Sequence, residues 1–108
     1  MIYTNSDGGA RGNPGPAALG VVIRDEAGIL LEYKEKLKGN KTNNFAEYMG
    51  LIRALQLAKK YTKEELICVL DSELIVKQLL GEYQVKSPKL KPLFLKVQEL
   101  QNDYKKTG

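Results

Sequence analysis

The amino-acid sequence predicts an α/β fold in which helices pack on a mixed sheet. Two extended segments, residues 17–24 and 29–36, flank a short acidic turn that ends in glycine, a pattern that predicts an antiparallel hairpin. A continuous apolar run at residues 66–70 is typical of a parallel strand. Residues 45–61 are rich in strong helix formers and supply the crossover that a parallel strand needs. Hairpin and parallel strand together predict one mixed sheet.

The chain has the length and composition of one globular domain. Its 108 residues predict a single domain over positions 1–108. Hydrophobic residues make up 43% and charged residues 28%, which favours a packed core over disorder. The longest apolar run, residues 17–23, is far shorter than the ~18–20 residues of a membrane span. No basic-then-apolar leader opens the chain, so we expect a soluble cytoplasmic protein without membrane partners.

Two scarce residue types limit the chemistry. The sequence contains no histidine, which excludes Ser-His and Cys-His nucleophilic pairs and histidine-ligated zinc. Cys68 is the single cysteine, so there is no disulfide within the chain. Any reaction must therefore use carboxylates, hydroxyls, amides, lysines or a bound metal.

The charge is moderately basic and unevenly distributed. Seventeen Lys and Arg against thirteen Asp and Glu give a net charge of +4. The excess lies after residue 85, where six lysines face two acidic residues. Such a segment suits a polyanion, and it is equally typical of a solvated lysine surface.

The first half of the chain is predicted to be mainly extended. Residues 2–7 favour a short strand. Residues 8–16 contain four glycines and two prolines, which predicts a loop rather than a helix or a central strand. The strands at 17–24 and 29–36 follow, and residues 38–44 are polar and turn-rich.

The second half is predicted to be mainly helical. After the helix comes the strand at residues 66–70, which we expect to be covered on both faces. A helix from Ser72, a suitable N-cap, to about Leu80 is ended by Gly81. A last helix starts near Pro92. Its amphipathic stripe consists of Leu90, Leu93, Phe94, Val97, Leu100 and Tyr104.

Two aspartates follow strands that are predicted to be neighbours. Asp7 ends the first strand and Asp71 directly follows the strand at 66–70. Parallel neighbours lie ~4.8 Å apart and end at the same edge, where open α/β sheets bind ligands, so both carboxylates could bind one cation. Singly, however, Asp7 could cap a turn and Asp71 could cap the following helix.

Glu47 is a carboxylate on the buried side of the predicted helix. At ~100° per residue, Leu51 and Ala54 fall within ~40° of it on the helical wheel, so it is centred on the inward stripe. An unpaired inward carboxylate costs several kcal/mol, and a divalent ion would offset that cost. A favourable interaction with the helix macrodipole is the alternative. Hard oxygen ligands favour Mg²⁺ or Mn²⁺ over zinc.

The glycine-rich segment does not have the features of a phosphate-binding P-loop. It lacks the terminal Gly-Lys-Ser/Thr, and the residues after it favour a strand. It is either a surface that brings backbone close to a partner such as nucleic acid, or a plain tight connection between strands.

Three motifs in order resemble ribonuclease H of type 1. They are the Asp-Gly-Gly-Ala-Arg-Gly-Asn-Pro-Gly-Pro string at 7–16, Thr-Asn-Asn at 42–44 with Glu47 three residues on, and Leu-Asp-Ser at 70–72. The resemblance runs from Ile2 to about Leu100, and residues 84–93 are similar to the family's link into its next helix. It implies a ribonuclease H-like mixed sheet and an endonuclease that hydrolyses the RNA strand of RNA–DNA hybrids.

The resemblance also implies roles for individual residues. Asp7, Glu47 and Asp71 match three of the family's four metal-binding catalytic carboxylates, which bind two Mg²⁺ ions, with Mn²⁺ as an alternative. The asparagines are expected in the minor groove of the hybrid and the threonine at a DNA phosphate. The matched substrate-binding positions are Gly12, Asn13, Thr42, Asn43, Asn44 and Ser72.

Several family features do not match this sequence. The family continues with a further strand, a histidine-bearing loop and a final helix that supplies the fourth carboxylate, so we expect a C-terminally truncated domain with weakened activity. Asp103 does not match that fourth acid, and Glu73 stands where relatives often have glutamine. The strand before Asp71 would become an exposed edge, which predicts a homodimer or swapped oligomer. The alternative function is a non-catalytic module that binds nucleic acid or self-associates.

Overall fold

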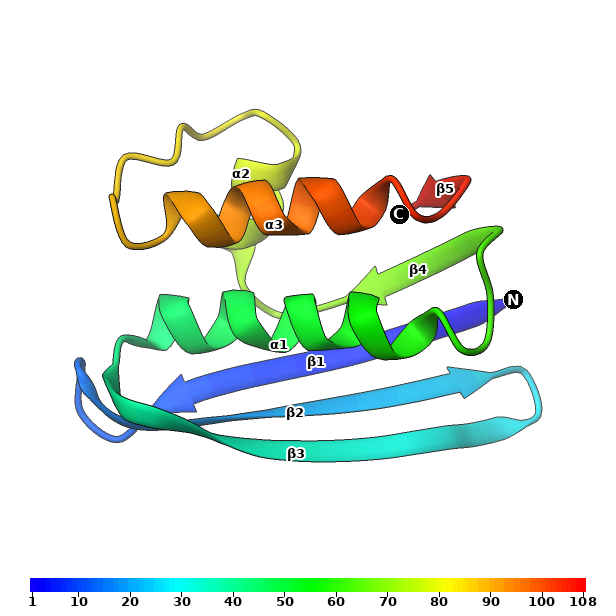
Figure 1. The fold of residues 1–108 in the computed structure, drawn as a ribbon, viewed down its shortest axis with the longest axis horizontal. Helices are drawn as coiled ribbons and strands as arrows, with labels where there is room; N and C mark the ends of the chain where they lie inside the picture. Colours follow the sequence, from blue (N-terminus) through cyan, green and yellow to red (C-terminus); the bar gives the residue numbers. More distant parts are fainter.

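A computed structural model describes all 108 residues as a mixed five-stranded sheet with three helices (Figure 1). The strand order is β3-β2-β1-β4-β5; β1, β2 and β3 pair antiparallel, whereas β4 runs parallel to both β1 and β5. The predicted fold class is confirmed. The elements are β1 (Ile2–Ala10), β2 (Gly15–Asp25), β3 (Gly28–Lys41), α1 (Asn43–Ala58), β4 (Glu65–Val69), α2 (Glu73–Leu79), α3 (Lys91–Gln101) and β5 (Lys106–Thr107).

The hydrophobic core lies between one face of the sheet and the helices. The helix α1 packs on β1 and β2, and α3 packs on α1 (Figure 1). Along β1, Thr4 and Ser6 are buried while Asn5 and Asp7 are exposed, because successive side chains point to opposite faces of a strand. The face opposite α1 is therefore open. The expectation that β4 is covered on both faces is wrong, since Val69 on the open face is 39% exposed.

The strands are longer than local sequence preference predicts. The glycine-rich segment joins the sheet at both ends, so that β1 extends to Ala10 and only residues 11–14 connect it to β2. The strand β3 extends through the expected turn region, because Gly15 and Pro16 of β2 pair with its last residues. Thr42 then caps α1, which begins two residues earlier than expected.

The strand β4 is not an edge strand. Residues Glu65 and Leu66 pair with β5, and the backbone of Cys68 donates a hydrogen bond to the carbonyl of Gly108 at 2.8 Å. The predicted exposed edge is therefore wrong over most of β4, because the last three residues of the chain occupy the positions that a second copy would need.

None of the three helices has the length and apolar character that a membrane span requires.

Candidate active site

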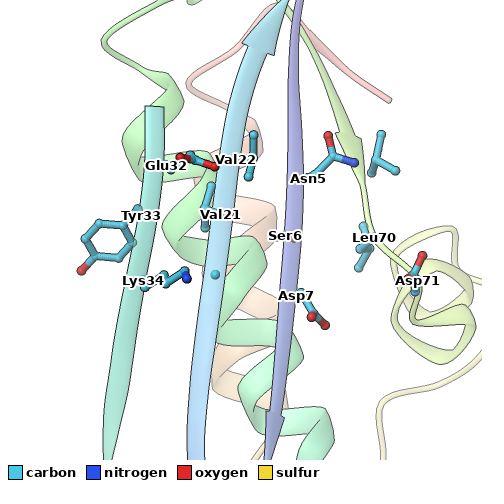
Figure 2. A pocket seen from close by; sticks show the side chains of 12 residues that line it. Asn5, Ser6, Asp7, Val21, Val22, Glu32, Tyr33, Lys34, Leu70 and Asp71 are labelled. Carbon is cyan, nitrogen blue, oxygen red and sulfur yellow. The ribbon is translucent and has the colours of Figure 1, made fainter. Parts of the chain in front are cut away.

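Asp7 lies within β1, and Asp71 lies two residues beyond the end of the neighbouring parallel strand β4. The β1–β4 register pairs Ile2 with Leu66 and Asn5 with Val69, a constant offset of 64 that also relates Asp7 to Asp71. Both aspartates are exposed and line one pocket of about 310 Å³ (Figure 2). The prediction that Asp7 ends its strand is wrong, because β1 continues to Ala10, but the two carboxylates line the same pocket.

Glu47 approaches this site from α1, which lies unusually close to β1. A Cβ atom added to Gly8 would overlap the carbonyl of Ala46, and one added to Gly50 would lie 3.1 Å from the carbonyl oxygen of Asp7. Two glycines thus let the helix rest on the strand backbone beside Asp7. This contact holds the first two turns of α1, which carry Glu47, against β1 beside Asp7, although Glu47 does not line the pocket of the two aspartates.

The three carboxylates are electrostatically coupled. Burial raises the pKa of Glu47, the negative charge of Asp7 raises it further, a backbone hydrogen bond from Gly8 opposes this, and Asp71 adds a smaller increase. The six ion pairs of the structure involve none of the three acids. Uncompensated negative charge is thus concentrated between β1, β4 and α1, as a cation site requires.

The carboxylates do not form a closed ligand cage. No group of three His, Cys, Asp or Glu side chains lies close enough to hold a single ion. The three acids therefore do not meet around one shared cation, but carboxylate oxygens without an ion-pair partner are chemically suited to Mg²⁺ or Mn²⁺. Ligands from elsewhere, such as phosphate oxygens or water, would have to complete the coordination.

Two of the predicted substrate-binding asparagines hold each other's segments in place. The backbone N–H of Asn43 donates to Oδ1 of Asn13 at 2.9 Å, and the N–H of Ala10 donates to Oδ1 of Asn43 at 2.8 Å. The connection between β1 and β2 is thereby tied to the first residue of α1. Both side chains are exposed, and neither amide nitrogen donates to a protein group.

The other predicted substrate-binding residues have clear structural roles. Thr42 and Ser72 are the N-caps of α1 and α2, accepting from the N–H of the third residue beyond at 3.1 and 3.3 Å. Gly12 has φ +84°, a conformation that other residues rarely adopt. Asn44 lies half-buried on the first turn of α1.

Two residues at the site were not singled out from the sequence. Gly50 follows Ala46 by one helical turn, so its place on the β1 side of α1 could have been found from helical spacing. Lys34 lies in one cross-strand row with Gly20 and Asp7 and lines the same pocket. In Figure 2 its side chain extends from β3 toward β2. That row depends on strand register, which a single sequence does not specify.

Comparison with known proteins decides the family. Residues 5–107 match the family profile described as Reverse transcriptase-like. RNase H1 from the archaeon Halobacterium salinarum has 36% sequence identity with this chain; the match covers 98% of this chain and 80% of that one, with a TM-score of 0.91. The chain belongs to the ribonuclease H type 1 family. The resemblance read from the three motifs is confirmed.

Other ribonuclease H structures agree. The N-terminal RNase H domain of a Mycobacterium tuberculosis protein is 38% identical, with a TM-score of 0.92 over 99% of this chain and 78% of that one. LC11-RNase H1, isolated from compost by a metagenomic approach and solved in complex with RNA/DNA hybrid, is 44% identical, with a TM-score of 0.89 over 99% of this chain and 81% of that one.

The curated relatives are longer than this chain. The chain matches a bifunctional protein of Mycobacterium tuberculosis at 40% identity over 107 residues, which is 97% of this ribonuclease H chain and 29% of the relative. It spans half of the Halobacterium salinarum ribonuclease HI, at 38% identity over 100 residues and 92% of this chain.

Proposed function

We propose that this chain hydrolyses the RNA strand of RNA–DNA hybrids as a metal-dependent endonuclease. Asp7, Glu47 and Asp71 are the catalytic carboxylates and hold the divalent ions, Mg²⁺ or Mn²⁺. The observation that best supports this is that both aspartates line one pocket and that the charge of each raises the pKa of Glu47. When bound, the metal would activate a water molecule and stabilise the leaving oxygen.

The protein's own residues select and orient the hybrid. The amides of the exposed Asn13 and Asn43 and of the half-buried Asn44 can both donate and accept hydrogen bonds, and therefore suit the 2′-hydroxyl that distinguishes RNA from DNA. Gly12, Thr42 and Ser72 complete the substrate-binding surface through backbone and hydroxyl groups. A solved relative in complex with RNA/DNA hybrid supports this choice of substrate.

A weakened activity is part of the proposal. Asp103 does not offer a fourth carboxylate to the site, because it follows α3 and forms an ion pair with Lys59 at 2.5 Å. With three carboxylates and an open ligand cage, we expect slower cleavage than in an enzyme with four.

The test is cleavage of labelled RNA–DNA hybrid by the 108-residue chain in Mg²⁺ or Mn²⁺, with double-stranded DNA and single-stranded RNA as comparisons. We expect RNA products with 5′-phosphate and 3′-hydroxyl ends, and loss of activity in Asp7→Asn. Hybrid cleavage no faster than that of Asp7→Asn would overturn the proposal.

No three acidic side chains lie close enough to bind one ion, and this observation favours one alternative, which is hybrid binding without turnover. In that case the affinity for hybrid would fall steeply with salt while no product forms in either metal. Measuring binding and cleavage on the same preparation separates the two functions.

A further inference from the structure

A buried hydrogen bond joins the two helices that flank the carboxylates. The hydroxyl of Tyr48 on α1 donates to Oε1 of Gln78 on α2 at 2.5 Å. Tyr48 is fully buried and Gln78 is 6% exposed. Burial raises the pKa of Tyr48 to about 12.

Each partner of this bond lies beside one part of the candidate site. Tyr48 directly follows Glu47 on α1. Gln78 lies on α2, the helix that Ser72 caps and that directly follows Asp71. The bond therefore connects the segment that carries Glu47 to the segment that carries Asp71.

Besides this bond, apolar contacts hold the helix α2, with Ile75 in the hydrophobic core and Leu79 packed against it. The helix has seven residues, it packs mainly against α1, and its buried residues are Ile75 and Gln78. An apolar contact such as that of Ile75 is not directional, whereas a hydrogen bond fixes distance and angle. The Tyr48–Gln78 bond therefore contributes directionally to the orientation of α2. That orientation in turn affects the position of Asp71, which lies in the short connection between β4 and α2.

We propose that Tyr48 and Gln78 are positioning residues that set the placement of Asp71 relative to Glu47. They touch neither metal nor substrate and act through the orientation of α2. The consequence for metal affinity rests on the proposed function, whereas the placement itself does not.

The chain contains a matched control for this proposal. Tyr104 is also buried, and its hydroxyl donates to the carbonyl of Leu55 at 2.5 Å. Burial raises its pKa to about 12 as well. This second bond joins the last turn of α1, two helical turns beyond Glu47, to the segment after α3, and it involves no residue of α2. Tyr104→Phe therefore removes an equivalent bond without affecting α2.

The first measurement is made without metal, by NMR on the full chain. In Tyr48→Phe we expect displaced amide shifts at Asp71 and Ser72 and faster hydrogen exchange in α2, while Tyr104→Phe leaves both unchanged. Equal changes in amide shifts and hydrogen exchange in the two variants would overturn the proposal, whether or not the chain cleaves RNA.

The second measurement is a Mg²⁺ titration followed by the same amide signals. We expect Tyr48→Phe to raise the half-saturating Mg²⁺ concentration about 10-fold, as loss of a supporting group commonly does, and Tyr104→Phe to leave it unchanged. The double variant Tyr48→Phe/Gln78→Leu removes both polar partners and should recover stability, but not metal affinity. Recovery of both would show that the bond is merely structural and would overturn the proposal. If the wild type binds no Mg²⁺ while Tyr48→Phe still alters the amide signals of α2 and Tyr104→Phe does not, the proposed function fails and the positioning role stands.

Discussion

The two halves of the candidate site are held by different kinds of contact. On the β1–α1 side, Gly8 and Gly50 allow helix and strand backbones to touch, so the placement of Asp7 and Glu47 depends on backbone packing. On the other side, Asp71 lies between a five-residue strand and a seven-residue helix, and side-chain hydrogen bonds hold that helix. Backbone packing tolerates almost no change in volume, whereas side-chain bonds can be removed one at a time.

The largest expected effect is on the backbone contact. In Gly8→Ala the added methyl group would overlap the carbonyl of Ala46, so helix and strand must separate. We expect the free energy of unfolding to fall by about 3 kcal/mol, measured by urea denaturation. The matched control is Gly9→Ala, because a Cβ there would meet only the side chain of Asn43 at 3.9 Å. A similar loss in both variants would show that the close approach is not the cause.

Removing a helix cap distinguishes the two halves on a smaller scale. Ser72→Ala removes the hydroxyl that caps α2, and Thr42→Ala removes the one that caps α1. Each loses about 1 kcal/mol of helix stability. We expect Ser72→Ala to speed hydrogen exchange mainly in α2, and Thr42→Ala to destabilise the whole domain, since α1 packs on the sheet. Global destabilisation of equal size in both would contradict this comparison.

An ion pair on the β3–α1 side predicts a pH dependence. Hydrogen bonds from Arg53 hold the pKa of Glu35 below its ordinary value of 4.5, with a further contribution from Tyr33. Because the folded-state pKa is depressed, the pair stabilises the fold above the unfolded-state pKa and this stability is lost as the pH falls through the folded-state pKa. Both side chains are about one-quarter exposed, so we expect Glu35→Gln to cost about 1 kcal/mol at pH 7.

The measurement is urea denaturation of wild type and Glu35→Gln between pH 7 and pH 3. The difference between them should shrink once the pH is below 4.5. The control is Glu99→Gln, whose carboxylate is 72% exposed and 3.6 Å from its lysine partner. A difference that does not vary with pH would show that the carboxylate charge is not what stabilises the fold.

The smallest expected effect concerns binding rather than folding. Lys34 is exposed, forms no ion pair and lines the pocket of Asp7 and Asp71, where a phosphate of a bound hybrid would be attracted to it. Lys34→Ala should leave the free energy of unfolding unchanged. It should reduce the slope of the logarithm of the hybrid-binding constant against the logarithm of the salt concentration by about 1, the loss of one phosphate contact. Lys63→Ala is the comparison, because this exposed lysine precedes β4 at its opposite end. An equal change in both would indicate unspecific attraction.

The sequence predicted every helix and strand except β5, and the three candidate acids, but not the contacts that join them. Asp71 could be placed from the end of an apolar run and Glu47 from the inward stripe of its helix, because these patterns are local, whereas Asp7 lies inside β1 and not at its end. The extension of β3 to Lys41 and the hydrogen bond between Tyr48 and Gln78 could not be predicted, since each partner lies 24 or more residues away. Gly8 favours a loop by propensity, yet it lies in β1 and pairs with Leu19 of β2. The position holds glycine because α1 packs so closely that there is no room for a side chain.

The hydrogen bonds that involve Asn13 and Asn43 have a consequence for any test of their proposed role in substrate binding. Each asparagine supports the segment that carries the other, so replacing one also disturbs the second. Single substitutions at these two positions should show strong epistasis, and a new preference would have to be introduced at both positions together with the connection between β1 and β2.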